Sequence, residues 1–151
     1  SKQYVQYNKV IKKPSNPKRS KYTFAGWYTD SKLTKAWDFN TKIKSGKTLY
    51  AKWKKISLKQ AVISKVQNVS GKKIKVTVKK VSGADGYQIQ YSTKSNMKSA
   101  KTVTSSKTTT TISKLSKGKK YYVRVKAYKK DSTGKKVAGK WSKVKNFKVS
   151  K

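Results

Sequence analysis

Apolar and polar residues alternate along several short stretches of this 151-residue chain. Residues 74–78 read Ile-Lys-Val-Thr-Val, and residues 121–127 read Tyr-Tyr-Val-Arg-Val-Lys-Ala. A period of two sends alternate side chains to opposite faces of a β-strand, so each stretch buries one face only. Turn-forming residues separate such stretches at near-regular spacing, as in Gly83-Ala-Asp-Gly86. The pattern predicts an all-β sandwich from Ile56 onward.

Aromatic residues dominate two stretches in the first third of the chain. Residues 22–30 read Tyr-Thr-Phe-Ala-Gly-Trp-Tyr-Thr-Asp, and residues 49–53 read Leu-Tyr-Ala-Lys-Trp. We predict strands over residues 4–11, 22–28 and 48–53. Gly26 predicts a bulge, because a glycine inside a strand often marks one. These elements define a second, smaller β-unit.

The aromatic side chains of this smaller unit allow two interpretations. They could stack on a carbohydrate, or they could form the core of the unit itself. We expect the core, because aromatic residues bury large apolar areas and the chain as a whole is only 34% hydrophobic. The residues concerned are Phe24, Trp27, Trp37, Phe39 and Trp53.

The chain carries 41 Lys and Arg residues against four acidic residues, a net charge of +37. All of the cations except Arg19 and Arg124 are Lys, and they are spread over both units. Such a field attracts polyanions and repels other copies of the chain, so we expect a monomer or an edge-paired dimer. Lysine is a hydrated point charge, whereas base-reading contacts favour Arg. We therefore expect binding to an acidic polysaccharide or cell-wall polymer, and only non-specific binding to nucleic acid in vitro.

The residue types that carry most enzyme chemistry are missing. His, Cys and Glu do not occur, and the carboxylate side chains are Asp30, Asp38, Asp85 and Asp131. Acid–base catalysis, nucleophilic catalysis and metal binding need clusters of such residues. We expect Asp30, Asp85 and Asp131 to bond to their own backbone in turns, and Asp38 to cap a turn or to pair with a Lys. We predict no enzyme activity, no cofactor, no metal and no membrane span, since no apolar run approaches roughly 20 residues.

The order Tyr-Thr-Phe-Ala-Gly-Trp-Tyr-Thr-Asp, Trp-Asp-Phe-Asn and Leu-Tyr-Ala-Lys-Trp resembles the Listeria–Bacteroides repeat, the B-repeat module of internalin-type surface proteins. The resemblance covers residues 4–54 and implies a small β-grasp-like module of bacterial surface proteins. It also implies an opening strand of Val-x-Phe character before a Gly-Gly turn, which the sequence does not show. We therefore expect residues 1–55 to form an N-terminally incomplete module that lacks its first strand and leaves an unpaired edge.

Residues 115–127 read Leu-x-x-Gly-x-x-Tyr-x-Val-x-Val-x-Ala, which resembles a signature of the fibronectin type III domain. Gly-Ala-Asp-Gly-Tyr-Gln-Ile-Gln-Tyr is similar to strand C of bacterial members, and Lys-Trp-Ser near the end is similar to the start of strand G. The resemblance implies that residues 56–151 form a seven-stranded fibronectin type III-like β-sandwich. It also implies that Leu115 and Tyr121 make a tyrosine corner.

The outward side of the strand at residues 121–127 is the best candidate for a binding site. If Tyr121 points inward, alternation sends cations and tyrosines to the opposite face, beside Gln88 and Gln90 of a neighbouring strand. Such a flat face suits a polyanionic sugar or a nucleic-acid backbone. The alternative is a solvated face that happens to be basic. The candidate polyanion-binding face consists of Tyr122, Arg124, Lys126, Tyr128, Lys143 and Lys145.

Two functions stay open on these grounds. The first is a polycationic adhesion module of a bacterial cell-surface or secreted protein, which binds acidic polymers such as teichoic acid or glycosaminoglycans. The second is a structural spacer or stalk that displays another domain and has no ligand of its own. Both place the chain at the cell surface or outside the cell.

Overall fold

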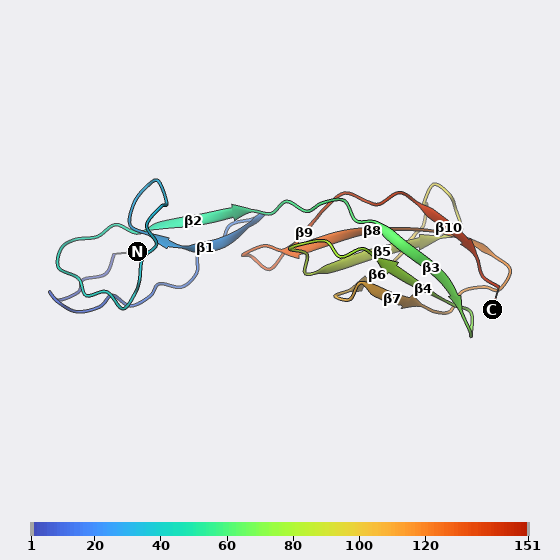
Figure 1. The fold of residues 1–151 in the computed structure, drawn as a ribbon, viewed down its shortest axis with the longest axis horizontal. Coiled ribbons are helices and arrows are strands. Elements are labelled where there is room, and N and C mark those ends of the chain that lie inside the picture. Colours follow the sequence, from blue (N-terminus) through green and yellow to red (C-terminus); the bar gives the residue numbers. More distant parts are fainter. Residues whose placement is uncertain (1, 151) are drawn as a thin grey trace. The chain divides into compact units, whose positions relative to one another are not determined.

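The computed structural model describes residues 2–150, which form ten β-strands and no helix (Figure 1). The chain divides into two compact units. Unit 1 contains the described residues up to Ile56 together with Asp131–Lys135. Unit 2 contains Ser57–Lys130 and the described residues from Lys136 onward. The predicted all-β class is confirmed.

Unit 2 is a sandwich of two antiparallel sheets (Figure 1). Its strands are β3 (Ile63–Val69), β4 (Lys73–Val78), β5 (Gly86–Ser92), β6 (Lys101–Ser105), β7 (Thr109–Ile112), β8 (Lys120–Lys130), β9 (Lys136–Ala138) and β10 (Lys145–Lys148). One sheet has the order β3-β4-β7, and the other has the order β10-β8-β5-β6, with β9 also paired to β8. Because β9 and β10 pair with opposite ends of β8, they share one strand position. The sandwich therefore has the seven positions that were predicted.

The core of unit 2 follows the period-two pattern of its strands. The largest fully buried side chains are Ile74, Val76, Ile89, Val123, Val125 and Val149, and most of these alternate with exposed or half-buried polar residues. Full burial of one such side chain contributes about 1.5–3 kcal/mol. The cluster is therefore the main source of stability for this unit.

The tyrosine corner expected at Leu115 and Tyr121 is present. The backbone N–H of Ser116 donates to the Tyr121 hydroxyl at 3.1 Å, and Leu115 is buried. The Tyr121 ring stacks on Phe147 of β10, with ring centroids 5.9 Å apart and an interplanar angle of 11°. This stack joins the corner to the edge strand of the sheet.

Unit 1 is built on a two-stranded antiparallel sheet of β1 (Tyr22–Tyr28) and β2 (Tyr50–Lys55). The register shifts between Phe24 and Trp27, and Gly26 between them has a φ of 118°. Residues with a side chain rarely adopt this φ, so the position favours glycine. The bulge predicted at Gly26 is confirmed.

The bulge leaves aromatic residues of both strands packed together. Phe24 pairs in register with Trp53, and Trp27 pairs with Ala51. The Phe24 ring meets Trp27 at 5.4 Å and Trp53 at 5.7 Å between centroids, both edge-to-face. Such pairs contribute about 0.5–1.5 kcal/mol each beyond area burial. These rings pack as expected of a core, but all three remain half-buried.

The strand predicted over residues 4–11 is absent. Tyr7 and Asn8 form a turn in which Asn8 has a φ of 64°, and Val10 makes only an isolated bridge with Lys42. Asparagine tolerates this left-handed conformation because its short polar side chain can bond to nearby backbone. The turn therefore interrupts the apolar alternation near the middle of the stretch.

Replacing Gly26 with alanine should destabilise unit 1 by about 1–2 kcal/mol, because φ near 118° strains any residue with a Cβ. A Cβ at Gly26 would meet Tyr28 at an ordinary 3.7 Å, so the cost is conformational. Gly46→Ala is the matched control, since a Cβ there meets nothing within 4 Å. Urea unfolding followed by tryptophan fluorescence measures both variants. Equal stabilities would contradict this account of the bulge.

Candidate polyanion-binding face

The outward side of β8 carries three of the residues that were predicted for the site. Tyr122, Arg124 and Lys126 are half-buried and alternate with the buried residues Val123 and Val125. The buried neighbours fix the strand against the core, so the outward side chains project from a rigid sheet. Rigid elements position a binding surface more sharply than loops do.

Arg124 is held by a glutamine side chain of the neighbouring strand β5. Gln90 of β5 lies directly opposite Arg124, and its Oε1 accepts hydrogen bonds from Arg124 Nε at 3.0 Å and Nη2 at 2.8 Å. Gln90 Nε2 in turn donates to Thr102 Oγ1 of β6 at 3.3 Å. The guanidinium has more N–H donors than these two bonds use. It can therefore stay anchored to the sheet and still donate to an anion.

Trp141 lies against both Arg124 and Lys126, although the sequence did not predict it on this face. The Trp141 ring centroid is 4.5 Å from Arg124 Cζ and 4.4 Å from Lys126 Nζ. Cation–π contacts of this kind contribute about 0.5–1 kcal/mol at exposed sites. Arg124, Lys126 and Trp141 thus form one group, the Trp141 cluster.

Ser142 fixes Trp141 along the edge of β8. The Ser142 N–H donates to the Val125 carbonyl at 2.7 Å, and the Val125 N–H donates to the Ser142 hydroxyl at 3.0 Å. This exchange lies between β9 and β10, where the regular ladder is interrupted. The available sequence signal was that Trp141, Val144 and Phe147 do not share one period.

Tyr128 was expected to be exposed on this face, and it is buried instead, with 7% of its surface accessible. Its hydroxyl lies above Gly86 of β5, where an added Cβ would be 2.8 Å away. Lys136 Nζ lies 4.9 Å from the ring centroid. Glycine at position 86 therefore makes room for the Tyr128 ring, and the ring offers little surface to a ligand.

Lys145 also differs from its expected place. It pairs with Val123, so it shares the core-facing side at the sheet edge, whereas Asn146 pairs with Tyr122 and takes the outward position. Lys143 is exposed in the segment between β9 and β10. The cations that share the outward side of β8 with Tyr122 therefore include Lys120, whose Nζ lies 5.6 Å from the Tyr122 ring centroid, and the two of the Trp141 cluster.

Asp30 and Asp38 each organise a local turn. Asp30 accepts backbone N–H bonds from Lys35 at 2.8 Å and from Thr34 at 3.1 Å. The bond from Lys35 is the main reason that the pKa of Asp30 is lowered. Asp38 accepts the N–H of Asn40 at 2.9 Å, so it caps a turn. The expectation for Asp30 is confirmed, and the alternatives for Asp38 resolve in favour of the turn.

Asp85 and Asp131 bind the backbone in different ways. Asp85 accepts the N–H of Lys130, a residue distant in the sequence, at 2.7 Å. This bond is the main reason that the pKa of Asp85 is lowered. Its expected bond within its own turn is thus replaced by a longer-range one. Asp131 accepts the Thr133 hydroxyl at 2.6 Å and the Lys21 N–H at 2.8 Å, which lower its pKa to about 2. Among residues 2–150, no three His, Cys, Asp or Glu side chains lie close enough together to hold a metal ion.

The bonds to Asp131 predict a loss of unit 1 stability in acid. Its pKa is lowered from 3.8 to about 2, so the stability it contributes is present above pH 3.8 and is lost as the pH falls through about 2. Asp131→Asn should therefore show a smaller decline in stability between about pH 5 and pH 2 than the parent chain. Asp38→Asn, which affects one local bond, is the control. Urea unfolding at each pH tests this, and an unchanged pH profile in Asp131→Asn would refute it.

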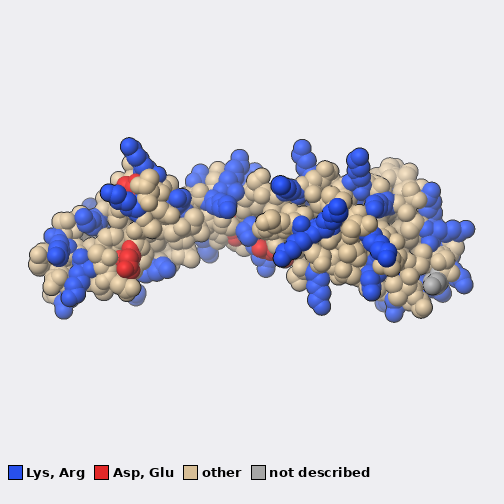
Figure 2. All heavy atoms as spheres, viewed as in Figure 1, with Lys and Arg blue, Asp and Glu red and all other residues tan. Residues whose placement is uncertain are grey.

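Few of the cations are neutralised by an acid. Within the described part of the chain one ion pair is present, between Lys129 Nζ and Asp85 Oδ1 at 3.3 Å. Lys and Arg side chains are spread over the visible surface of both units, and acidic side chains are sparse there (Figure 2). The positive potential is therefore a property of each unit's surface, and the Trp141 cluster is one locality within it.

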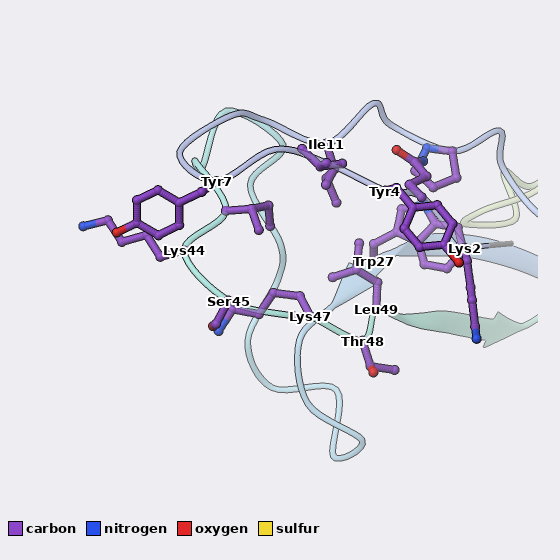
Figure 3. Close-up of a pocket in the computed structure, with 15 residues that line it drawn as sticks. Lys2, Tyr4, Tyr7, Ile11, Trp27, Lys44, Ser45, Lys47, Thr48 and Leu49 are labelled. Atoms are coloured by element: carbon purple, nitrogen blue, oxygen red, sulfur yellow. The ribbon is translucent and has the colours of Figure 1, made fainter.

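Unit 1 contains a cavity of about 690 Å³ that the sequence analysis did not predict. Its walls come from β1, from the N-terminal segment and from the segment that precedes β2 (Figure 3). Most of these walls are irregular backbone, which explains why no periodic pattern marked them. Residues that line the cavity include Tyr4, Tyr7, Ile11, Trp27, Ile43, Lys44, Lys47 and Leu49.

Comparison with known families agrees with both halves of this architecture. Residues 63–140 match the family model of the fibronectin type III domain, and residues 1–52 match that of the Listeria-Bacteroides repeat domain. The fibronectin match covers more than half of the chain, so the protein belongs to the fibronectin type III family. A Listeria-Bacteroides repeat precedes this domain, as the sequence resemblances indicated.

Solved structures of fibronectin type III domains share the fold. The FN1–FN3 domains of chicken CNTN1 are similar with a TM-score of 0.53 and 21% identity, over 75% of this chain and 38% of that one. The sixth fibronectin type III domain of human fibronectin type III domain containing protein 3 gives a TM-score of 0.51 and 19% identity, over 64% and 90%. At these identities the likeness concerns the fold alone.

Two proteins of Evansella cellulosilytica are similar over 50 residues, with 48% and 42% identity. Their provisional names are Gly-rich membrane protein and membrane protein. Each match covers 32% of this chain but only 6% and 8% of the respective relative. The part described here contains no helix long and apolar enough to cross a membrane.

The two kinds of module define a general setting for the chain. Fibronectin type III domains and Listeria-Bacteroides repeats are typical of extracellular or surface proteins, and they are typically non-catalytic. Both fit a surface or stalk module.

Proposed function

We propose that this chain is an adhesion segment of a bacterial surface or secreted protein that binds acidic polymers through charge. The observation that carries the proposal is a net charge of +37, with a single ion pair among the described residues. Unpaired lysines gain from binding phosphate or sulfate groups, because each contact releases condensed counterions from the polymer. The expected partners are teichoic acid and sulfated glycosaminoglycans, and DNA binds without sequence preference.

Within this field, the outward face of β8 is the proposed focus of binding. The Trp141 cluster holds two cations over one indole ring, and Gln90 orients the guanidinium. Tyr122 lies on the same side of the strand. An anchored pair of cations loses less side-chain entropy on binding than two free lysines do. This face therefore adds more affinity per charge than the surrounding surface.

Affinity should fall steeply with salt and depend little on the identity of the polymer. Each phosphate contact lowers the logarithm of the binding constant by about 0.9 per tenfold increase in salt for duplex DNA. Affinity for heparin, teichoic acid and DNA is measured at several NaCl concentrations. Binding that survives high salt and selects one polymer would contradict a mechanism based on charge alone.

Reversing both cations of the Trp141 cluster should weaken heparin binding about tenfold more than an equal charge change elsewhere. The test variant is Arg124→Glu/Lys126→Glu. The matched control is Lys73→Glu/Lys75→Glu, which changes the same charge at the same spacing on exposed positions of β4. Circular dichroism verifies that both variants fold. Equal losses of affinity in the two variants would show that the β8 face has no special role.

The alternative function is a structural spacer that displays another domain and binds nothing itself. The division into two compact units favours it, because tandem modules of this kind extend a chain. We propose that the domains span residues 1–55 and 56–151 and that the segment is a monomer or an edge-paired dimer. Absence of polyanion binding at low salt would leave the spacer as the function.

A further inference from the structure

The aromatic face of the β1–β2 sheet in unit 1 is incompletely covered. Every described side chain among residues 2–56 keeps part of its surface in solvent, including Phe24, Trp27 and Trp53. In unit 2, by contrast, Ile89 and Val125 have no accessible surface. Further burial of apolar surface gains about 25 cal/mol per Å². Unit 1 therefore stands to gain from a partner that covers this face.

Strand β2 has an edge without a partner strand. Among the strands of residues 2–150, β2 pairs only with β1. The far edge of β1 is partly occupied, because the Trp37 N–H donates to the Trp27 carbonyl at 2.8 Å and the Thr29 N–H donates to the Lys35 carbonyl at 3.0 Å. The far edge of β2 has no such backbone bond within the described chain. An open edge of this kind is a template for an added strand.

The cavity of unit 1 adjoins the start of this open strand. Leu49 is the residue immediately before β2, and it lines the cavity together with Trp27, Ile11 and Ile43 (Figure 3). The volume of about 690 Å³ is within the range of ligand-binding pockets. The indole Nε1 of Trp27 is buried without a hydrogen-bond partner among the described residues.

The rim of the cavity is basic. Lys2, Lys44 and Lys47 contribute to its lining, and none of the lining residues is acidic. Lys44 and Lys47 are exposed to solvent. An occupant with negative charges beside an apolar group therefore complements both the rim and the interior.

From these observations we propose that unit 1 binds an extended acidic peptide segment of a partner protein. The peptide adds a strand to β2, places an apolar side chain in the cavity, and sets its flanking carboxylates against the lysine rim. A sugar fits less well, because the aliphatic side chains of Ile11, Ile43 and Leu49 leave its hydroxyl groups without acceptors. A second copy of this chain is disfavoured by its own charge of +37.

The first experiment compares two labelled peptides of equal charge. The probe peptide alternates Val and Asp over about eight residues, which is within the usual range of strand lengths. In the control peptide, prolines replace two of the valines and remove N–H groups that a strand ladder needs. Fluorescence anisotropy with the full chain at about 0.5 M NaCl, where the Debye length is about 4 Å, suppresses general attraction. We expect the probe to bind at least about tenfold more tightly, and equal affinities would overturn the proposal.

The second experiment locates the site on the chain. Lys44→Glu/Lys47→Glu should weaken binding of the probe about tenfold. The matched control is Lys114→Glu/Lys117→Glu, a pair of exposed lysines in unit 2 with the same spacing, and it should bind as the parent does. Hydrogen exchange should also slow at the amides of β2 when the probe is bound. Equal losses in the two variants, or unchanged exchange in β2, would overturn the proposal.

This peptide site and the polyanion face can be tested separately. The reversal of Arg124 and Lys126 should leave affinity for the probe peptide unchanged, because these residues belong to unit 2. Loss of probe binding in that variant would assign the peptide to the general charge of the chain and would overturn the site in unit 1. Failure of heparin binding alone would refute the polyanion face and leave the peptide site supported.

Discussion

Mutual repulsion among 41 cations opposes every compact state of this chain, and only four acids are present to offset it. What opposes the repulsion in unit 2 is the period-two pattern of its strands. Val123 and Val125 of β8 point into the core, while Arg124 and Lys126 point outward. The same alternation that builds the core therefore also lays out the charged surface. A shift of one residue in register would bury lysines and expose valines, so the pattern fixes both together.

The four aspartates neutralise little of the positive charge of the chain. Asp30, Asp38, Asp85 and Asp131 each accept at least one backbone N–H, and only Asp85 also forms an ion pair within the described chain. Carboxylates that accept backbone bonds stabilise turns and strand ends, and their lowered pKa values keep most of them ionised in mild acid. Acids that hold the fold in this way leave the lysines free to meet an external anion.

Features set by local sequence were predictable, whereas several features that depend on contacts between strands were not. The bulge at Gly26 and the outward placement of Arg124 and Lys126 follow from glycine chemistry and from alternation within one strand. The burial of Tyr128 depends on Gly86 in a neighbouring strand, which no pattern within β8 reveals. The cavity of unit 1 was missed for the same reason, because its walls come from segments that lack a period and meet only in the folded chain.

Trp141 shows how an interrupted strand can place an additional side chain over a regular sheet. A continuous edge strand would have sent successive side chains alternately inward and outward. Instead the chain leaves the ladder after β9, and Ser142 re-attaches it to Val125 before β10 begins. The interruption allows one indole ring to lie against Arg124 and Lys126 together, although the two cations belong to successive outward positions of β8. A local departure from sheet geometry thus converts evenly spaced charges into a cluster, and the buried core beneath it supplies the rigidity that such a cluster needs.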